Sequence, residues 1–147
     1  MSVDTEIKIA FLLRYTQIKE RVLVLLERKK AYEEDIYGLK SPTLSDMPKS
    51  SHKTDLGDKV VKLLSVTSDI DNEIAELTDK MEYIKAVIYK TKNYRLLSIL
   101  ELKYIDGLPR KQIASVLGDI SVMLVDRLAR RAIASIQITE EDVKRVM

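Results

Sequence analysis

The strongest constraint on the fold is a heptad pattern of mainly apolar residues between residues 56 and 88. Side chains that recur at alternating spacings of four and three lie on one face of an α-helix. Ten positions follow this spacing without a missed step: Leu56, Val60, Leu63, Thr67, Ile70, Ile74, Leu77, Met81, Ile84 and Ile88. The pattern predicts a helix from near Asp55 to about Tyr89 or Lys92 that packs against another helix.

The N-terminal residues carry a similar seam with a wider apolar stripe. Its positions are Phe11, Tyr15, Ile18, Val22, Leu25, Lys29, Tyr32 and Ile36, flanked by Ile7, Ala10, Leu12, Leu13, Leu23 and Leu26. This pattern predicts a helix from near Asp4 to about Tyr37, ending at Gly38. Because the stripe is wider than a two-stranded seam needs, more than one partner helix is expected to cover it.

Residues 1–92 are therefore predicted to form a long, coiled-coil-like antiparallel helical hairpin that serves as an oligomerisation region. A hairpin alone leaves part of the first stripe exposed, and a homodimer through the long helices is the economical way to bury it. The competing interpretation is that the stripe binds another protein, such as host RNA polymerase. Periodicity does not separate these two interpretations.

A connection at residues 38–54 interrupts the two helical patterns. It contains Pro42, Pro48 and many small polar residues, which are typical of an irregular linker. Because a connection of this length is unusual between adjacent helices, Leu44 and Met47 are expected to dock on the helices or on a partner. His52, which has no second ligand or nucleophile nearby in the sequence, is interpreted as a surface residue.

Composition agrees with an all-α protein. Of 147 residues, 33% are charged and 5% aromatic, with four glycines and three prolines, which favours long helices over sheets. The absence of cysteine excludes a disulfide scaffold and a thiolate metal site and fits a reducing cytosol. With no segment of membrane-spanning length, we expect a soluble protein in the cytoplasm, without a membrane partner.

Catalytic motifs are absent from the sequence. It has no Gly-rich phosphate loop, no paired His/Asp/Glu ligand set, and no Ser or Lys with a base partner at motif spacing. We therefore expect neither an enzyme nor a bound cofactor or metal.

Residues 96–136 have the outline of a DNA-reading unit: a helix, a turn, a short helix, a tight turn and a third helix. Gly107 is predicted to end the first helix, and Pro109 to take the first position of the second. Gly118 is expected to follow the second helix, which runs through Leu117, and Ser121 to cap the third. This short turn is expected to make the last two helices cross.

The third of these helices has an apolar face and a mixed face. The apolar face is expected to enter the core through Val125, Ala129, Ala132 and Ile136. Apolar residues of the preceding helices are expected to join them there: Ile99, Leu100, Leu102, Tyr104, Ile113, Ala114 and Leu117. The mixed face would lie against the major groove of DNA. The candidate DNA-binding residues on this face and beside it are Arg110, Lys111, Ser121, Val122, Met123, Asp126, Arg127 and Arg130.

Charge agrees with this location but does not establish it. Residues 93–136 contain seven Lys or Arg against four Asp or Glu, a net charge of +3, while residues 41–92 have a net charge of −1 from eight against nine. Arg110 and Lys111 open the second helix of the unit, where their cations and free backbone N–H groups are suited to a phosphate. The alternative is an ordinary three-helix bundle with a solvated charged face.

The motif from Leu102 to Leu108, followed by residues 112–114, Leu117-Gly118, Ser121, Val125 and Arg131-Ala132, resembles the sigma-factor region that reads the −35 promoter element. This resemblance implies base-reading positions at Val122, Met123, Asp126 and Arg127, and phosphate contacts at or beside Arg110, Lys111 and Arg130. Val122 and Met123 are suited only to apolar groups such as thymine methyls, and Asp126 repels phosphate. Modest affinity per unit is therefore expected, which implies a dimer or a second partner.

The whole arrangement is similar to phage late-gene transcriptional regulators of the ArpU/RinA type. The similarity includes Ser41-Pro42 and Met47-Pro48 in the connection and the sigma-like helix-turn-helix at residues 93–138. It implies a sequence-specific activator of phage late genes that binds double-stranded DNA in a bacterial host cell.

Two other functions remain open. One is a coiled-coil adaptor whose C-terminal unit binds protein, which is favoured if Val122, Met123, Leu124 and Leu128 form one exposed apolar patch. The other is a ring-forming phage DNA-packaging subunit of the small-terminase kind. Residues 139–147 are predicted to be a C-terminal tail with a short helix capped by Thr139, which precedes Asp142 by three positions.

Overall fold

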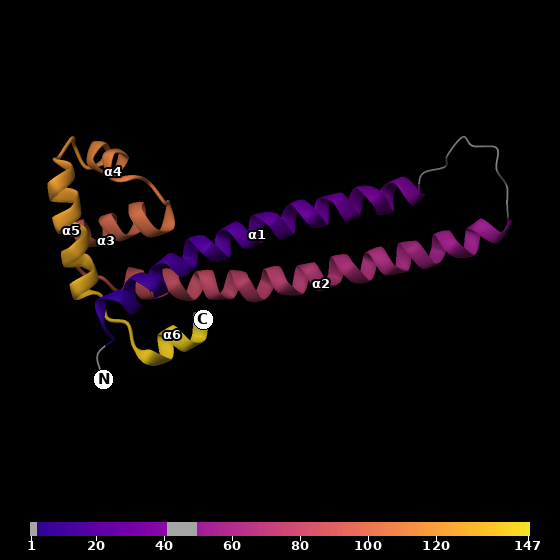
Figure 1. The fold of residues 1–147 in the computed structure, drawn as a ribbon, viewed down its shortest axis with the longest axis horizontal. Coiled ribbons are helices and arrows are strands. Elements are labelled where there is room, and N and C mark those ends of the chain that lie inside the picture. The colour runs from indigo at the N-terminus through magenta and orange to yellow at the C-terminus, as the bar shows by residue number, and fades with distance from the viewer. Residues whose placement is uncertain (1–2, 41–49) are drawn as a thin grey trace. The chain divides into compact units, whose positions relative to one another are not determined.

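The computed structural model describes the backbone of residues 3–40 and 50–147, and the side chains of residues 3–38 and 57–147. All regular structure in these ranges is helical, as predicted for an all-α protein. The elements are α1 (Thr5–Lys40), α2 (Ser50–Tyr89), α3 (Tyr94–Leu100), the π-helical turn η1 (Glu101–Ile105), α4 (Arg110–Val116), α5 (Val122–Ser135) and α6 (Glu140–Val146) (Figure 1). Nowhere in the described chain is a helix long and apolar enough to cross a membrane.

The chain divides into two compact units. The core unit comprises Met1–Glu20 and Thr78–Met147, and the paired-helix unit comprises Arg21–Leu77. Both long helices contribute residues to each unit, since α1 and α2 pass through both ranges. In the core unit, the first turns of α1 and the last turns of α2 contact the C-terminal helical segments.

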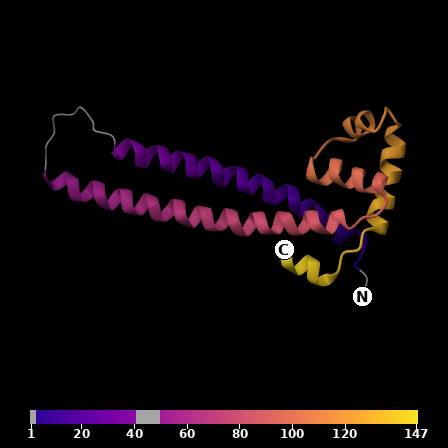
Figure 2. The same cartoon turned by 180° about the vertical axis from the view of Figure 1, so that it is seen from behind.

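In the paired-helix unit, α1 and α2 lie side by side with opposite chain directions (Figures 1 and 2). The predicted seam positions lose exposure: Leu25, Ile36, Thr67 and Ile70 are buried, and Val22, Lys29, Tyr32, Val60, Leu63, Ile74 and Leu77 are half-buried. One ion pair lies beside this seam, with Arg21 Nε 3.1 Å from Glu73 Oε2, and the seam residue Lys29 forms another, with its Nζ 2.8 Å from Asp71 Oδ1. The Leu56 side chain lies outside the described residues.

Both long helices extend further than predicted. Helix α1 continues past Gly38 to Lys40, and α2 begins at Ser50 and not near Asp55. A single glycine costs a helix only about 1 kcal/mol relative to alanine, too little to stop a helix of this length. The predictions for Leu44, Met47 and the prolines of the connection, like that for the His52 side chain, concern positions outside the described residues.

Every helix contributes to the interior of the core unit. The largest fully buried side chains are Phe11, Leu12, Ile84, Ile88, Ile99, Leu100, Ile113, Val125 and Val146. Polar contacts also tie the beginning of α1 to distant segments: Lys8 Nζ donates to Ile133 O at 3.3 Å, and the Thr16 hydroxyl donates to Tyr104 O at 3.4 Å. The first turns of α1 are therefore part of the support for the C-terminal helices.

Helix α6 has the predicted N-terminal cap. The Thr139 hydroxyl accepts from the Asp142 N–H at 3.1 Å, and Asp142 Oδ2 accepts from the Thr139 N–H at 2.9 Å. Further contacts hold the helix in the core unit: the Tyr83 hydroxyl donates to Asp142, the Arg145 guanidinium lies 4.7 Å from the Tyr83 ring centroid, and Val146 is fully buried. The C-terminal residues are therefore an integral part of the core.

Candidate nucleic-acid interface

A helical segment formed by α3 and η1 precedes the two helices of the candidate interface. It begins at Tyr94, two residues before the predicted start, because Asn93 Oδ1 accepts from the N–H groups of Arg95 and Leu96 at 3.0 and 3.2 Å. A π-helical turn completes the segment, with the Asp106 N–H donating to Glu101 O at 2.9 Å. Gly107 follows with φ +68°, a left-handed conformation that glycine adopts readily, so the predicted end of this helix is confirmed.

Helix α4 begins one residue later than predicted. Pro109 is the cap residue, with an extended backbone (φ −69°, ψ 159°), and Arg110 takes the first helical position. Proline adopts this extended conformation without strain. Its missing N–H is not needed at the cap position or at the first helical position. At the other end, Gly118 has φ +90° as expected, whereas the left-handed Asp119 (φ +58°) was not predicted.

Helix α5 begins as the sequence predicts. The Ser121 hydroxyl accepts from the Leu124 N–H at 3.1 Å, which satisfies one free donor of the first turn. The predicted core residues Val125, Ala129, Ala132 and Ile136 are all buried, and so are Leu128 and Ile133, which were not assigned to the core. Helix α5 packs against both α3 and α4, which explains why its buried face is wider than the four-residue stripe.

The remaining face of α5 is open to solvent. Met123 is 76% exposed, and both Arg127 and Arg130 are exposed. Val122 and Asp126 are half-buried at the edges of this face. All five predicted base-reading or phosphate positions on α5 therefore lie on its accessible side.

An ion pair joins the exposed sides of α4 and α5. Arg110 Nη1 donates to Asp126 Oδ2 at 2.7 Å, and the two side chains are 62% and 36% exposed. A guanidinium carries five N–H donors, so Arg110 retains others for a second acceptor. Lys111, the next residue, is exposed. The acidic residue on the face thus serves to orient one of the predicted phosphate-binding cations.

A basic groove beside this face was not predicted. A cavity of about 510 Å³ is lined by residues that include Lys103 of η1, Asp126 and Arg130 of α5, and Thr5 and Ile9 of α1. Lys103 is half-buried, and its Nζ lies 5.5 Å from the Tyr104 ring centroid. Helical periodicity did not identify Lys103, because a π-helical turn shifts the face to which the following side chains belong.

The apolar patch on which the adaptor interpretation depends is not present. Leu128 is only 5% exposed, while Val122 and Leu124 are half-buried and Met123 is exposed. Leu128 belongs to the buried side of α5 because it lies three residues after Val125 and one before Ala129, within the packed stripe. The condition that would favour the adaptor interpretation, one exposed patch formed by all four residues, is therefore not met.

In comparisons with known proteins, the chain matched no protein-family model, no curated protein and no solved structure.

Proposed function

We propose that the chain is a sequence-specific DNA-binding transcriptional regulator in which α4 and α5 act as a helix-turn-helix unit. The observation that carries the proposal is the exposed face of α5, with Met123, Arg127 and Arg130, beside the exposed Arg110 and Lys111 of α4. A helix with such a face is suited to the major groove when cations on a neighbouring element can hold the phosphate backbone.

The side chains divide into two roles. Arg127 is suited to pair with the O6 and N7 acceptors of a guanine, and Met123 and Val122 to contact thymine methyl groups. Arg110, Lys111 and Arg130 would hold phosphates, and Lys103 extends this set because it lines the same groove as Arg130. Asp126 would act through Arg110, to which it is hydrogen bonded.

We also propose that two copies associate through the long helices, with each copy forming an antiparallel hairpin. In the paired-helix unit, the seam between α1 and α2 leaves other apolar side chains exposed: Leu23 56%, Leu26 46%, Val61 66% and Leu64 48%. Burying such side chains against a second copy would stabilise a dimer. Two DNA-reading units in one dimer compensate for the few polar groups on each α5 face.

The resemblance to ArpU/RinA-type regulators makes activation of phage late genes in the cytoplasm of a bacterial host the most specific form of the proposal. Contact with host RNA polymerase would be the route to activation. Both features rest on the resemblance, whereas DNA binding also rests on the α5 face.

The direct test is selection of bound sequences from a randomised duplex pool by the intact protein at several salt concentrations. We expect recovery of a motif and an affinity that falls as salt rises, since phosphate contacts release counterions. Arg127→Ala should relax one position of the motif. Arg130→Ala and Lys103→Ala should each lower the log-log salt slope by about 0.9 without changing the motif.

Arg28→Ala is the matched control, because it removes one exposed positive charge from α1 in the paired-helix unit. It should leave both the motif and the salt slope unchanged. If neither a motif nor salt-sensitive retention appears, the DNA-binding proposal fails and a protein partner should be sought. A solution mass well above that of a dimer, together with DNA binding, would favour the packaging subunit instead.

A further inference from the structure

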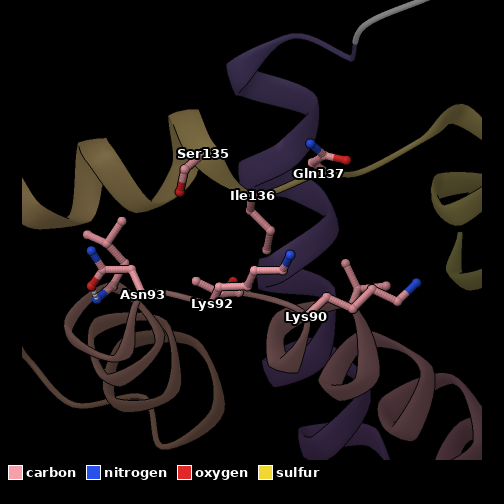
Figure 3. Close-up of a pocket in the computed structure, with 9 residues that line it drawn as sticks. Lys90, Lys92, Asn93, Ser135, Ile136 and Gln137 are labelled. Carbon is pink, nitrogen blue, oxygen red and sulfur yellow. Dashed lines mark hydrogen bonds between the residues drawn. The ribbon is translucent and has the colours of Figure 1, made fainter.

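A second cavity lies in the core unit and contains none of the proposed DNA-binding residues. Its volume is about 470 Å³. The lining residues come from the end of α2, the connection to α3, α3 itself, the last residue of α5 and the segment that follows it, and they include Val87, Lys90, Lys92, Asn93, Leu96 and Ile136. In Figure 3, Lys90, Lys92 and Asn93 lie along one side and Ser135, Ile136 and Gln137 along the other. We call this space the α2–α3 cavity.

One hydroxyl in this cavity lacks a partner. Thr91 Oγ1 is buried and makes no hydrogen bond with any described residue, although the Thr91 N–H donates to Ile88 O at 3.0 Å. Buried polar groups in folded proteins are nearly always hydrogen bonded, because an unpaired group loses its contacts with water without replacement. Because this oxygen has almost no accessible surface, an occupant of the cavity would satisfy it only after the Thr91 side chain rotates toward the cavity.

The charged side chains of the cavity are donors, and Asn93 adds a free amide group, while Gln137 and Ser135, whose hydroxyl donates to Ala132 O, also offer acceptors. Asn93 Oδ1 is occupied by the N–H groups of Arg95 and Leu96, which fixes the amide and leaves the two Nδ2 hydrogens available. Lys90 and Lys92 form no ion pair with a described residue, and the lining contains no Asp or Glu. The charge of Lys90 helps to lower the pKa of the nearby Asp142, whose hydrogen bonds are made with Tyr83 and Thr139. An excess of donors suits an oxyanion.

The cavity also has an apolar wall. Val87, Leu96 and Ile136 are 3%, 7% and 3% exposed, and they line the space together with the polar groups. Because a phosphate group alone would fill only a small part of about 470 Å³, the apolar wall suits a second, less polar part of a ligand. A phosphomonoester carries a charge of about −1.5 to −2 near neutral pH, which matches two ammonium groups.

We propose that the α2–α3 cavity binds a small organic phosphomonoester. Its phosphate oxygens accept from the Lys90 and Lys92 ammonium groups and from Asn93 Nδ2. The Thr91 hydroxyl adds a further donor once its side chain rotates toward the cavity. Its organic part contacts Val87, Leu96 and Ile136. The site is independent of the proposed DNA interface, and it joins the end of α2 to the segment that follows α5.

The test titrates the full-length protein with phenyl phosphate and, separately, with inorganic phosphate at constant ionic strength. Calorimetry measures the affinity, and amide chemical shifts locate the site. We expect saturable one-to-one binding, shifts centred on residues 90–93 and 135–137, and several-fold tighter binding of phenyl phosphate because of the apolar wall. Absence of saturable binding of both ligands up to about 10 mM would overturn the proposal.

A pair of double variants separates a built site from general attraction of anions. Lys90→Gln/Lys92→Gln should weaken phenyl phosphate binding at least about tenfold, whereas Lys59→Gln/Lys62→Gln removes the same charge from exposed positions of α2 and should have no effect. Circular dichroism verifies that both variants are folded. Equal losses in the two double variants would overturn the proposal.

Two single variants place the ligand. Thr91→Val keeps the shape of the side chain and removes the hydroxyl, so we expect a several-fold loss of affinity. An unchanged affinity together with a higher melting temperature would show that the hydroxyl does not contact the ligand and would overturn its placement. Arg127→Ala should bind phenyl phosphate normally; loss of binding in this variant would assign the phosphate to the DNA face and overturn the α2–α3 site.

Discussion

The core unit and the paired-helix unit contain similar apolar patterns but bury them to different extents. All of the largest fully buried side chains, among them Phe11, Ile84 and Leu100, belong to the core unit. In the described part of the paired-helix unit, the buried side chains are Leu25, Ile36, Thr67 and Ile70, with exposures between 2% and 8%. Its Leu23 and Val61 remain more than half exposed.

The difference follows from how many neighbours each helix face has. In the core unit, α5 packs against α3 and α4, and contacts from α1 and α6 add to the same interior. Two paired helices can cover only one stripe on each other, so the remaining apolar side chains of a wide stripe stay in water. The core unit thus buries its apolar faces within one chain, whereas the paired-helix unit would gain stability from the second copy proposed above.

The largest expected effect concerns the core. Leu100→Ala removes most of a fully buried side chain and should lower the free energy of unfolding by about 2–5 kcal/mol, through lost burial and the cavity left behind. Chemical denaturation followed by circular dichroism measures this loss. Because the effect lies within one chain, it should not depend on protein concentration. A loss below about 1 kcal/mol would indicate a loosely packed core.

A second substitution addresses the exposed stripe. Leu23→Ser together with Leu26→Ser should weaken self-association at least about tenfold, because each buried leucine contributes about 1.5–3 kcal/mol to an apolar interface. Sedimentation equilibrium measures the dissociation constant. Ser68→Ala, at an exposed position of α2, is a control that should change nothing. A wild-type protein that stays monomeric at all concentrations would contradict the inference that this unit needs a partner.

A smaller effect depends on pH and on the contacts of α6. Burial alone would raise the pKa of the Asp142 carboxyl, but hydrogen bonds from Thr139 and Tyr83 outweigh burial and hold its pKa below the ordinary value of 3.8. The same hydrogen bond raises the pKa of the Tyr83 hydroxyl, which donates to Asp142.

A carboxyl with a lowered pKa stabilises the folded state above its ordinary pKa, and this contribution is lost as the pH falls through the lowered value. The melting temperature of the wild type should therefore fall more steeply below about pH 4 than that of Asp142→Asn. Melting curves of both proteins between about pH 5 and pH 2 measure the difference. Parallel curves would show that Asp142 does not couple α6 to pH.

The smallest expected effect is that of a surface ion pair in the paired-helix unit. Arg21 and Glu73 are 3.1 Å apart, with side chains 47% and 44% exposed. A double-mutant cycle with Arg21→Met and Glu73→Gln should give a coupling of only about 0.2–1 kcal/mol, smaller still at high salt, because solvent screens exposed charges. A coupling as large as the effect of Leu100→Ala would mean that ion pairs, and not the seam, hold this unit together.

The sequence by itself determined the features that depend on neighbours within about one helical turn. The heptad spacing identified the buried seam of α1 and α2, including the buried Thr67. Gly107, Gly118 and Ser121 marked the ends of the C-terminal helices, and Thr139 with Asp142 marked the cap of α6. These rules are local because a cap, a left-handed turn and a helical face are each defined by residues a few positions apart.

Only the tertiary structure decided which faces meet. The contacts of Lys8 with Ile133, Thr16 with Tyr104 and Tyr83 with Asp142 join positions far apart in the chain. The same packing buried Leu128, placed Lys103 and Arg130 in the lining of one cavity, and placed Thr91 in the wall of the α2–α3 cavity. Burial and cavities depend on the shapes of several packed elements at once, and periodicity in one helix does not contain that information.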